Sequence, residues 1–292
     1  MSIVLGIPCV DGVVLGVDLQ YTKEPFKNTG PKLFPLKKYY NKNTYSVLVA
    51  GSGNPESCKK FADMMEQDLP DDFSFSDFII HAESIIGEFN QHYIFPMPQE
   101  SRKDYSCDLL IAVRVDRECR LYGVNGLMLV RHEQPVCTGE GSYLADYLLE
   151  NLLPKGFITV EAAAQFMVHA INSSKNYITS VGKGTSVHIL RDDGRHYSLL
   201  KPDRAGIELY FQELFDAFAR LMYCCDVESA SNESVEIHIG SLRRIMALIR
   251  QNHAELIANR IKLKELTGLQ CSTADPSGPQ PSPESPGESD EF

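Results

Sequence analysis

The chain has 292 residues, of which 43% are hydrophobic, so it is long enough for one large domain with extensions or for two domains. Its formal net charge of −11 argues against a nucleic acid or an anionic membrane as the main partner. None of the cysteines form a Cys-x-x-Cys pair, the histidines show no ligand spacing, and no apolar run is long enough to span a membrane. We therefore expect a protein of the reducing cytoplasm that has no metal and no cofactor.

The first twenty residues predict a β-hairpin whose start carries a small hydroxyl residue. Ser2 directly follows Met1, and the apolar segment 3–7 predicts a strand. Asp11-Gly12 predicts a turn, and the return run 13–17 ends on Asp18. If Met1 is removed, Ser2 carries a free α-amine and a hydroxyl, which can act together as base and nucleophile.

The next segment, up to residue 105, combines strands with a pair of helices. The polar stretch 21–31 contains Gly and Pro and predicts a loop, and the segment 96–105 predicts another. The remaining patterns predict strands at 32–36 and 45–50 and amphipathic helices at 56–69 and 74–93, with Ser74 or Ser76 as N-cap of the second helix.

The same order is repeated between residues 109 and 200. Strands are predicted at 109–115, 120–124, 127–131, 135–138, 186–190 and 196–200, and helices at 142–152 and 159–177. Antiparallel hairpins with separate helix pairs indicate an α+β architecture with helices on both sides of packed sheets. Further along the chain, amphipathic helices are predicted at 207–222 and 235–266, and the Pro- and Ser-rich acidic end from about residue 270 predicts disorder.

This opening and this element order resemble the N-terminal-nucleophile hydrolases, in particular the proteasome β-type subunits and their bacterial relatives. When Ser2 is counted as the first residue, Asp18 is the seventeenth, which is the family's spacing. The resemblance covers about residues 2–200 and implies a four-layer αββα sandwich of two antiparallel sheets between helix pairs. The helices predicted beyond residue 200 form a C-terminal helical extension that the resemblance does not cover. We expect a proteasome-like domain at 1–200, a helical extension at 201–268 and a disordered acidic tail at 269–292.

The resemblance also implies which residues carry the chemistry. Ser2 is the expected nucleophile, and Asp18 is expected to hold the ammonium of Lys32, which would favour the alkoxide; Lys37 and Lys38 are rivals for Lys32. The Gly51 position in Gly51-Ser-Gly53 is expected to supply the N–H that binds the oxyanion. Ser142 is expected to support the terminal amine, or alternatively to cap the helix that follows.

One departure from the family pattern concerns the residues before the strand at 186–190. The family often has an aspartate there, whereas residues 176–180 of this chain contain no carboxylate. Thr179 or Ser180 is expected to offer a hydroxyl instead.

The resulting expectation is a peptidase that hydrolyses peptide bonds of a peptide or an unfolded protein through an acyl-enzyme on Ser2. The resemblance further implies a homo-oligomeric ring or spiral with an ATPase unfoldase as a possible partner. Two alternatives remain open, namely a catalytically silent structural or assembly subunit and a hydrolase of small amides.

Overall fold

The computed structural model describes residues 2–23, 26–36, 45–154, 156, 158–226, 233 and 235–251. Contacts group residues 1–245 into one compact unit and residues 246–292 into a second one, of which only 246–251 are described. The predicted rivals Lys37 and Lys38, the end of the helix predicted at 235–266 and the predicted tail lie outside the described residues. The three predicted domain boundaries stay predictions.

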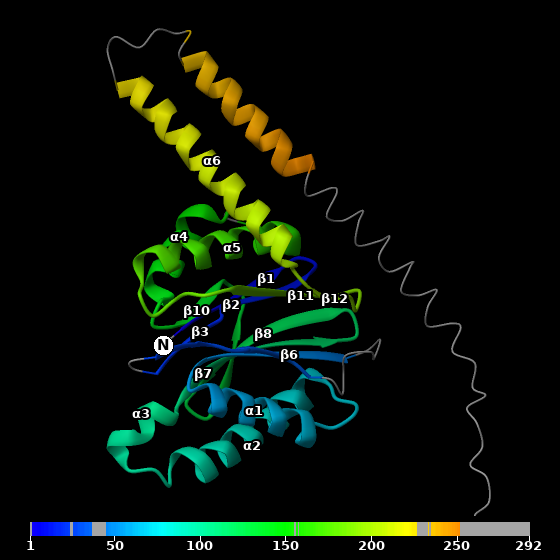
Figure 1. The fold of residues 1–292 in the computed structure, drawn as a ribbon. Coiled ribbons are helices and arrows are strands. Elements are labelled where there is room, and N and C mark those ends of the chain that lie inside the picture. Colours follow the sequence, from blue (N-terminus) through cyan, green and yellow to red (C-terminus); the bar gives the residue numbers. More distant parts are fainter. Residues whose placement is uncertain are drawn as a thin grey trace, which may run out of the picture. The chain divides into compact units, whose positions relative to one another are not determined.

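The first unit contains two five-stranded antiparallel sheets that pack face to face (Figure 1). One sheet has the order β10-β1-β2-β11-β12, and the other has the order β5-β6-β7-β8-β9. The strands of the first sheet are β1 (Ile3–Cys9), β2 (Gly12–Asp18), β10 (Val136–Gly139), β11 (Thr185–Arg191) and β12 (His196–Ser198). Those of the second are β5 (Leu33–Pro35), β6 (Tyr45–Gly53), β7 (Cys107–Val115), β8 (Glu118–Asn125) and β9 (Met128–His132).

Helices cover the outer face of each sheet (Figure 1). The first sheet is covered by α4 (Ser142–Leu152) and α5 (Val160–Tyr177), and α6 (Lys201–Asp226) packs on α5. The second sheet is covered by α1 (Pro55–Asp68) and α2 (Phe75–Phe89). The predicted αββα sandwich is therefore confirmed.

Three hydrophobic clusters match these layers. One lies between the sheets and includes Val4, Leu15 and Leu48, and the other two lie between each sheet and its helices. Strand β2 is buried along its whole length because one face meets the second sheet and the other meets α5. This explains why its sequence is an almost unbroken apolar run instead of an alternating one.

Local sequence signals account for the helix starts. Ser74 and Asp77 form a capping box at α2, and Thr159 caps α5 by accepting a hydrogen bond from the N–H of Ala162. Ser76 lies inside α2, so it is not the N-cap.

The structure differs from the predictions in the two stretches expected to be loops. Residues 20–29 form a hairpin of β3 (Gln20–Lys23) and β4 (Phe26–Thr29), which joins neither five-stranded sheet. Because this hairpin pairs with neither five-stranded sheet, its sequence need not show the alternation that marks a half-buried strand. Residues after α2 continue as the π-helical turn Asn90–Ile94, followed by the 3-10 turn Gln99–Ser101 and α3 (Arg102–Tyr105).

Candidate active site

Ser2 immediately precedes β1 and lies beside the end of β6. Its side chain is 1% exposed in the chain that carries Met1. Its Oγ accepts a hydrogen bond of 3.3 Å from the backbone N–H of Gly53. Gly139 of β10 packs on the other side of Ser2: a Cβ at this position would lie 2.3 Å from the Ser2 carbonyl oxygen, so only glycine fits. The ends of β6 and β10 therefore pack tightly against Ser2.

Asp18 ends β2, and its fully buried carboxylate accepts hydrogen bonds from four donors. Oδ1 accepts from the N–H of Ile3 at 2.9 Å and from the Lys32 ammonium at 2.6 Å. Oδ2 accepts from the N–H groups of Gln20 and Gly182, each at 3.1 Å. The same carboxylate oxygen thus contacts the lysine and the peptide group that follows Ser2.

Lys32 directly precedes β5 and points inward, with no exposed side-chain surface. Burial lowers the pKa of its ammonium, and the charge of Asp18 together with their hydrogen bond opposes this lowering. The Nζ atom also lies 5.0 Å from the centre of the Tyr21 ring. The structure thus brings Asp18 and Lys32 together beside the start of β1 as a buried ion pair.

The glycine expected to bind the oxyanion has its N–H engaged elsewhere. The Gly51 N–H donates to the carbonyl of Lys32 at 2.9 Å, as part of the pairing between β5 and β6. Gly53, two residues further on, has its N–H on the same edge of β6, but here the pairing with β5 has ended and Ser2 Oγ is the acceptor. The hydrogen bonds therefore favour Gly53 over Gly51 as the donor at this site.

Sequence reasoning missed Gly53 because the motif contains two glycines and only the strand pairing distinguishes them. Gly53 has φ = +97°, and a Cβ on it would lie 2.6 Å from the carbonyl oxygen of Ser106. A glycine is therefore required at this position. The signal available in the sequence was that the two glycines are two residues apart. In a strand, this spacing predicts that both N–H groups point to the same side.

Ser142 is the first residue of α4, while its N-cap is Gly141 and no side chain caps the helix. The alternative that Ser142 caps this helix is therefore wrong. Its expected role beside the terminal amine stays a prediction.

The turn before β11 approaches Asp18 through its backbone. Gly182 donates to the carboxylate, and the Gln20 side-chain amide donates to the carbonyl of Thr179 at 3.1 Å. Ser180 is 6% exposed, and its hydroxyl has no hydrogen-bond partner among the described residues. The expectation that Thr179 or Ser180 replaces the family's aspartate stays a prediction.

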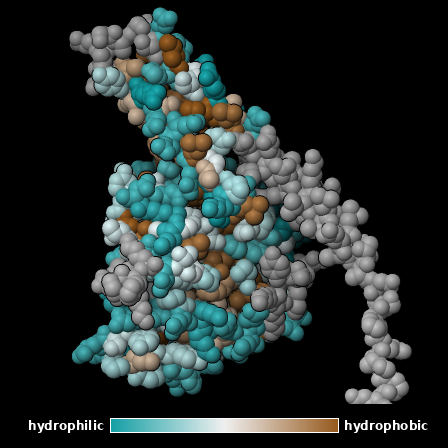
Figure 2. Space-filling model, in the orientation of Figure 1, coloured by the Kyte–Doolittle hydropathy of each residue, from teal (hydrophilic) through white to brown (hydrophobic). Residues whose placement is uncertain are grey.

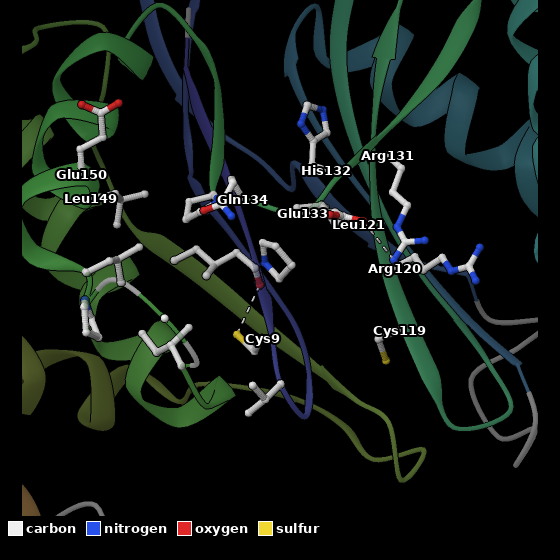
Figure 3. Close-up of a pocket in the computed structure, with 18 of the residues that line it drawn as sticks. Cys9, Cys119, Arg120, Leu121, Arg131, His132, Glu133, Gln134, Leu149 and Glu150 are labelled. Carbon is white, nitrogen blue, oxygen red and sulfur yellow. Dashed lines mark hydrogen bonds and ion pairs between the residues drawn. The ribbon is translucent and has the colours of Figure 1, made fainter.

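A cavity of about 760 Å³ opens at the opposite end of β1 (Figure 3). Leu149 and Glu150 of α4 line one side, and Arg120 of β8 and His132 of β9 line the other. Ile7 and Cys9 contribute from the far end of β1, and none of the predicted site residues take part. This cavity is therefore separate from the candidate active site.

Within the described ranges, no group of three or more His, Cys, Asp or Glu side chains could hold a metal ion. No described helix combines the length and the apolar character needed to cross a membrane.

Solved structures with the same fold include three bacterial proteins named Anbu. Anbu (ancestral beta-subunit) from Yersinia bercovieri is 15% identical, with a TM-score of 0.62 over 75% of this chain and 97% of that chain. Anbu from Pseudomonas aeruginosa, described as a helical assembly, is 16% identical, with a TM-score of 0.61 over 75% and 96%. A Gly-1 mutant of Anbu from Hyphomicrobium sp. strain MC1 is 11% identical, with a TM-score of 0.61 over 75% and 97%.

At these identities the similarity shows the fold alone. No curated protein sequence matches the chain. The model of the proteasome subunit family, however, matches residues 2–190, which is more than half of the chain. The chain therefore belongs to the proteasome subunit family.

Proposed function

We propose that the chain is a proteasome-like N-terminal-nucleophile peptidase whose nucleophile is the Ser2 hydroxyl, released for catalysis when Met1 is removed. One observation carries the proposal: Asp18 Oδ1 accepts hydrogen bonds from both the Lys32 ammonium and the Ile3 N–H, directly beside Ser2. The nitrogen of Ser2 is an amide while Met1 is attached, and it becomes an amine with a pKa near neutrality after cleavage.

These positions support the following reaction. The Ser2 hydroxyl attacks the substrate carbonyl, and its proton passes to the α-amine of the same residue, directly or through a water molecule. The N–H of Gly53 stabilises the oxyanion that forms, and the buried ammonium of Lys32 favours the anionic form of the hydroxyl. The protonated amine then gives its proton to the leaving amine, and water hydrolyses the ester on Ser2.

The proposed setting of this activity is a cytoplasmic homo-oligomer that acts on peptides or unfolded proteins. The fold similarity to the Anbu helical assembly supports an assembly of identical chains. The mass of the native complex measures the size of the oligomer. The same measurement in the presence of cell extract tests a partnership with an ATPase unfoldase.

Labelling with a peptide epoxyketone tests the catalytic proposal, because this probe reacts with a terminal amine and a hydroxyl together. We expect one adduct per chain on a protein that has lost Met1, and no adduct on Ser2→Ala. Ser76→Ala changes an exposed serine of α2 and serves as the matched control, which keeps full labelling. A processed chain that the probe leaves unlabelled would contradict the proposal.

The second candidate is a catalytically silent subunit of the same fold. The hydroxyl of Ser180, which lies where the family often has a carboxylate, has no partner among the described residues, and this observation favours the silent subunit. An intact mass that includes Met1 in the native protein supports this candidate, because the nitrogen of Ser2 is then blocked. Turnover of a small amide without turnover of peptides would instead identify the small-amide hydrolase.

A further inference from the structure

A second cavity, of about 1090 Å³, is lined by residues of α5 and α6 and of the chain next to β2 and β11. Lys175 and Asn172 contribute from α5, Arg204 and Glu208 from α6, and Leu19 and Gly184 from the two strand connections. Ser2, Asp18 and Lys32 do not line it. In Figure 1 the start of α6 passes α5.

Cations outnumber carboxylates in the lining of this cavity. Lys175, Lys183, Lys201 and Arg204 contribute positive charge, and Glu208 and Asp216 contribute negative charge. In the part of the chain that the structure describes, no ion pair within 4.0 Å joins any of the four cations to a carboxylate. This local excess of positive charge contrasts with the net charge of −11 of the chain.

Two of these cations are partly withdrawn from water. Lys175 donates to Asn172 Oδ1 at 2.7 Å and to the Thr185 hydroxyl, and Arg204 donates to the carbonyl of Leu199 at 2.6 Å. All three acceptors are neutral, and burial lowers the pKa of both cations. The carboxylates of Glu208 and Asp18 near Lys175, and of Glu208 and Asp203 near Arg204, oppose this lowering only in part. Because partly buried cations whose charge is incompletely balanced raise the free energy of the folded state, an anion in this cavity would stabilise it.

The hydrogen bonds of the wall also suit an anion. Asn172 Oδ1 accepts from Lys175 and from the hydroxyl of Thr185, at 2.7 and 3.0 Å. The Nδ2 group of the same amide is buried, and among the described residues it has no acceptor. The wall thus has a surplus of donors, and phosphate and carboxylate groups present only acceptors when ionised.

We propose that this cavity binds a small multivalent anion carrying phosphate or carboxylate groups. Its volume slightly exceeds the usual range of small-molecule sites, so it has room for a ligand larger than a single phosphate ion. Thr185 lies opposite Asp18 in the pairing of β11 with β2, so the ligand would contact the strand end that carries the buried ion pair. Binding at this cavity does not depend on activity at Ser2.

Isothermal titration of the full chain with pyrophosphate, citrate and inorganic phosphate, at constant ionic strength, tests the proposal. We expect one saturable site, with pyrophosphate or citrate binding more tightly than phosphate. Preference for pyrophosphate identifies a phosphorylated ligand, and preference for citrate identifies a polycarboxylate. Arg204→Gln should weaken binding at least tenfold, whereas Lys59→Gln, which removes an exposed positive charge on α1, should leave it unchanged.

A second variant keeps the test decisive if Arg204→Gln fails to fold. Lys183 and Lys201 are exposed at the rim, so the double variant Lys183→Gln/Lys201→Gln should fold normally and still lose about tenfold in affinity. Pyrophosphate or citrate should raise the melting temperature of the wild type more than that of this variant. The proposal is overturned if none of the three anions saturates a site at millimolar concentration, or if the rim variant binds as tightly as Lys59→Gln.

Discussion

Replacing Asp18 by asparagine should destabilise the fold far more than the loss of one charge at the surface would. Each carboxylate oxygen accepts from two donors: Oδ1 from Ile3 and Lys32, and Oδ2 from Gln20 and Gly182. Whichever way the amide of an asparagine is turned, its NH₂ group would face two hydrogen-bond donors. The Lys32 ammonium would in addition be left buried without a counter-ion. Breaking a buried pair in this way costs about 3–5 kcal/mol.

A double-mutant cycle separates the ion pair from the backbone hydrogen bonds. Lys32→Met leaves the carboxylate with its three N–H donors and should cost a similar amount, since it leaves a buried carboxylate without its cation. The double variant Asp18→Asn/Lys32→Met lacks both charges, so its loss should be smaller than the sum of the single losses by about 2 kcal/mol or more. Denaturant unfolding followed by circular dichroism measures all four free energies.

The exposed pair of Glu118 and Arg120 supplies the control. Their side chains are 53% and 24% exposed at a distance of 2.6 Å, so Glu118→Gln should cost less than about 1 kcal/mol. Two results would refute the account of Asp18 as a shared acceptor for four donors. One is a loss of unfolding free energy below about 1 kcal/mol for Asp18→Asn, and the other is a double variant whose loss equals the sum of the two single losses.

Three further outcomes follow from the structure. Gly53→Ala should reduce epoxyketone labelling at least tenfold, because the backbone N–H that donates to Ser2 must shift to make room for the new Cβ. Gly126 also has a positive φ, but no atom lies within 4 Å of the position that its Cβ would take. Gly126→Ala should therefore leave labelling unchanged. Nδ1 of His188 lies 3.0 Å from Nε2 of His196, and burial lowers the pKa of the two rings to about 3 and about 4. Both rings therefore stay neutral in the folded state down to about pH 5. Stability should therefore decrease as the pH falls below about 6.5, by about 2 kcal/mol per ring at pH 5, and a double replacement by glutamine should flatten the unfolding free energy against pH. Ser180→Ala should raise the free energy of unfolding by about 1 kcal/mol, because it removes a buried hydroxyl that has no partner among the described residues. A destabilisation would instead reveal a bond from this hydroxyl to another group.

The sandwich could be predicted because its buried strands and amphipathic helices have strong periodic patterns. Helix α4 begins and ends at the predicted residues, and β2 was recognisable from an apolar run that ends on a carboxylate. The hairpin 20–29 was missed because polar strands outside the sheets carry no such pattern.

The candidate site was accessible from the sequence only in part. Ser2, Asp18 and Lys32 could be selected because their spacing resembles a family pattern, and the structure places Asp18 and Lys32 in contact. The choice between Gly51 and Gly53 depends on where β5 stops pairing with β6, which is a property of two strands separated in the chain. The approach of Gly182 to Asp18 depends in the same way on the distant pairing of β11 with β2.

The four donors around Asp18 also imply an order of events during synthesis. They come from residues 3, 20, 32 and 182, so a nascent chain that has not yet emerged beyond β11 cannot complete this shell. A half-made polypeptide therefore lacks the Gly182 donor, and the carboxylate of Asp18 obtains its full set of hydrogen bonds only when most of the domain has been synthesised. The arrangement beside Ser2 that the proposed peptidase activity requires would then be complete only after the domain has closed.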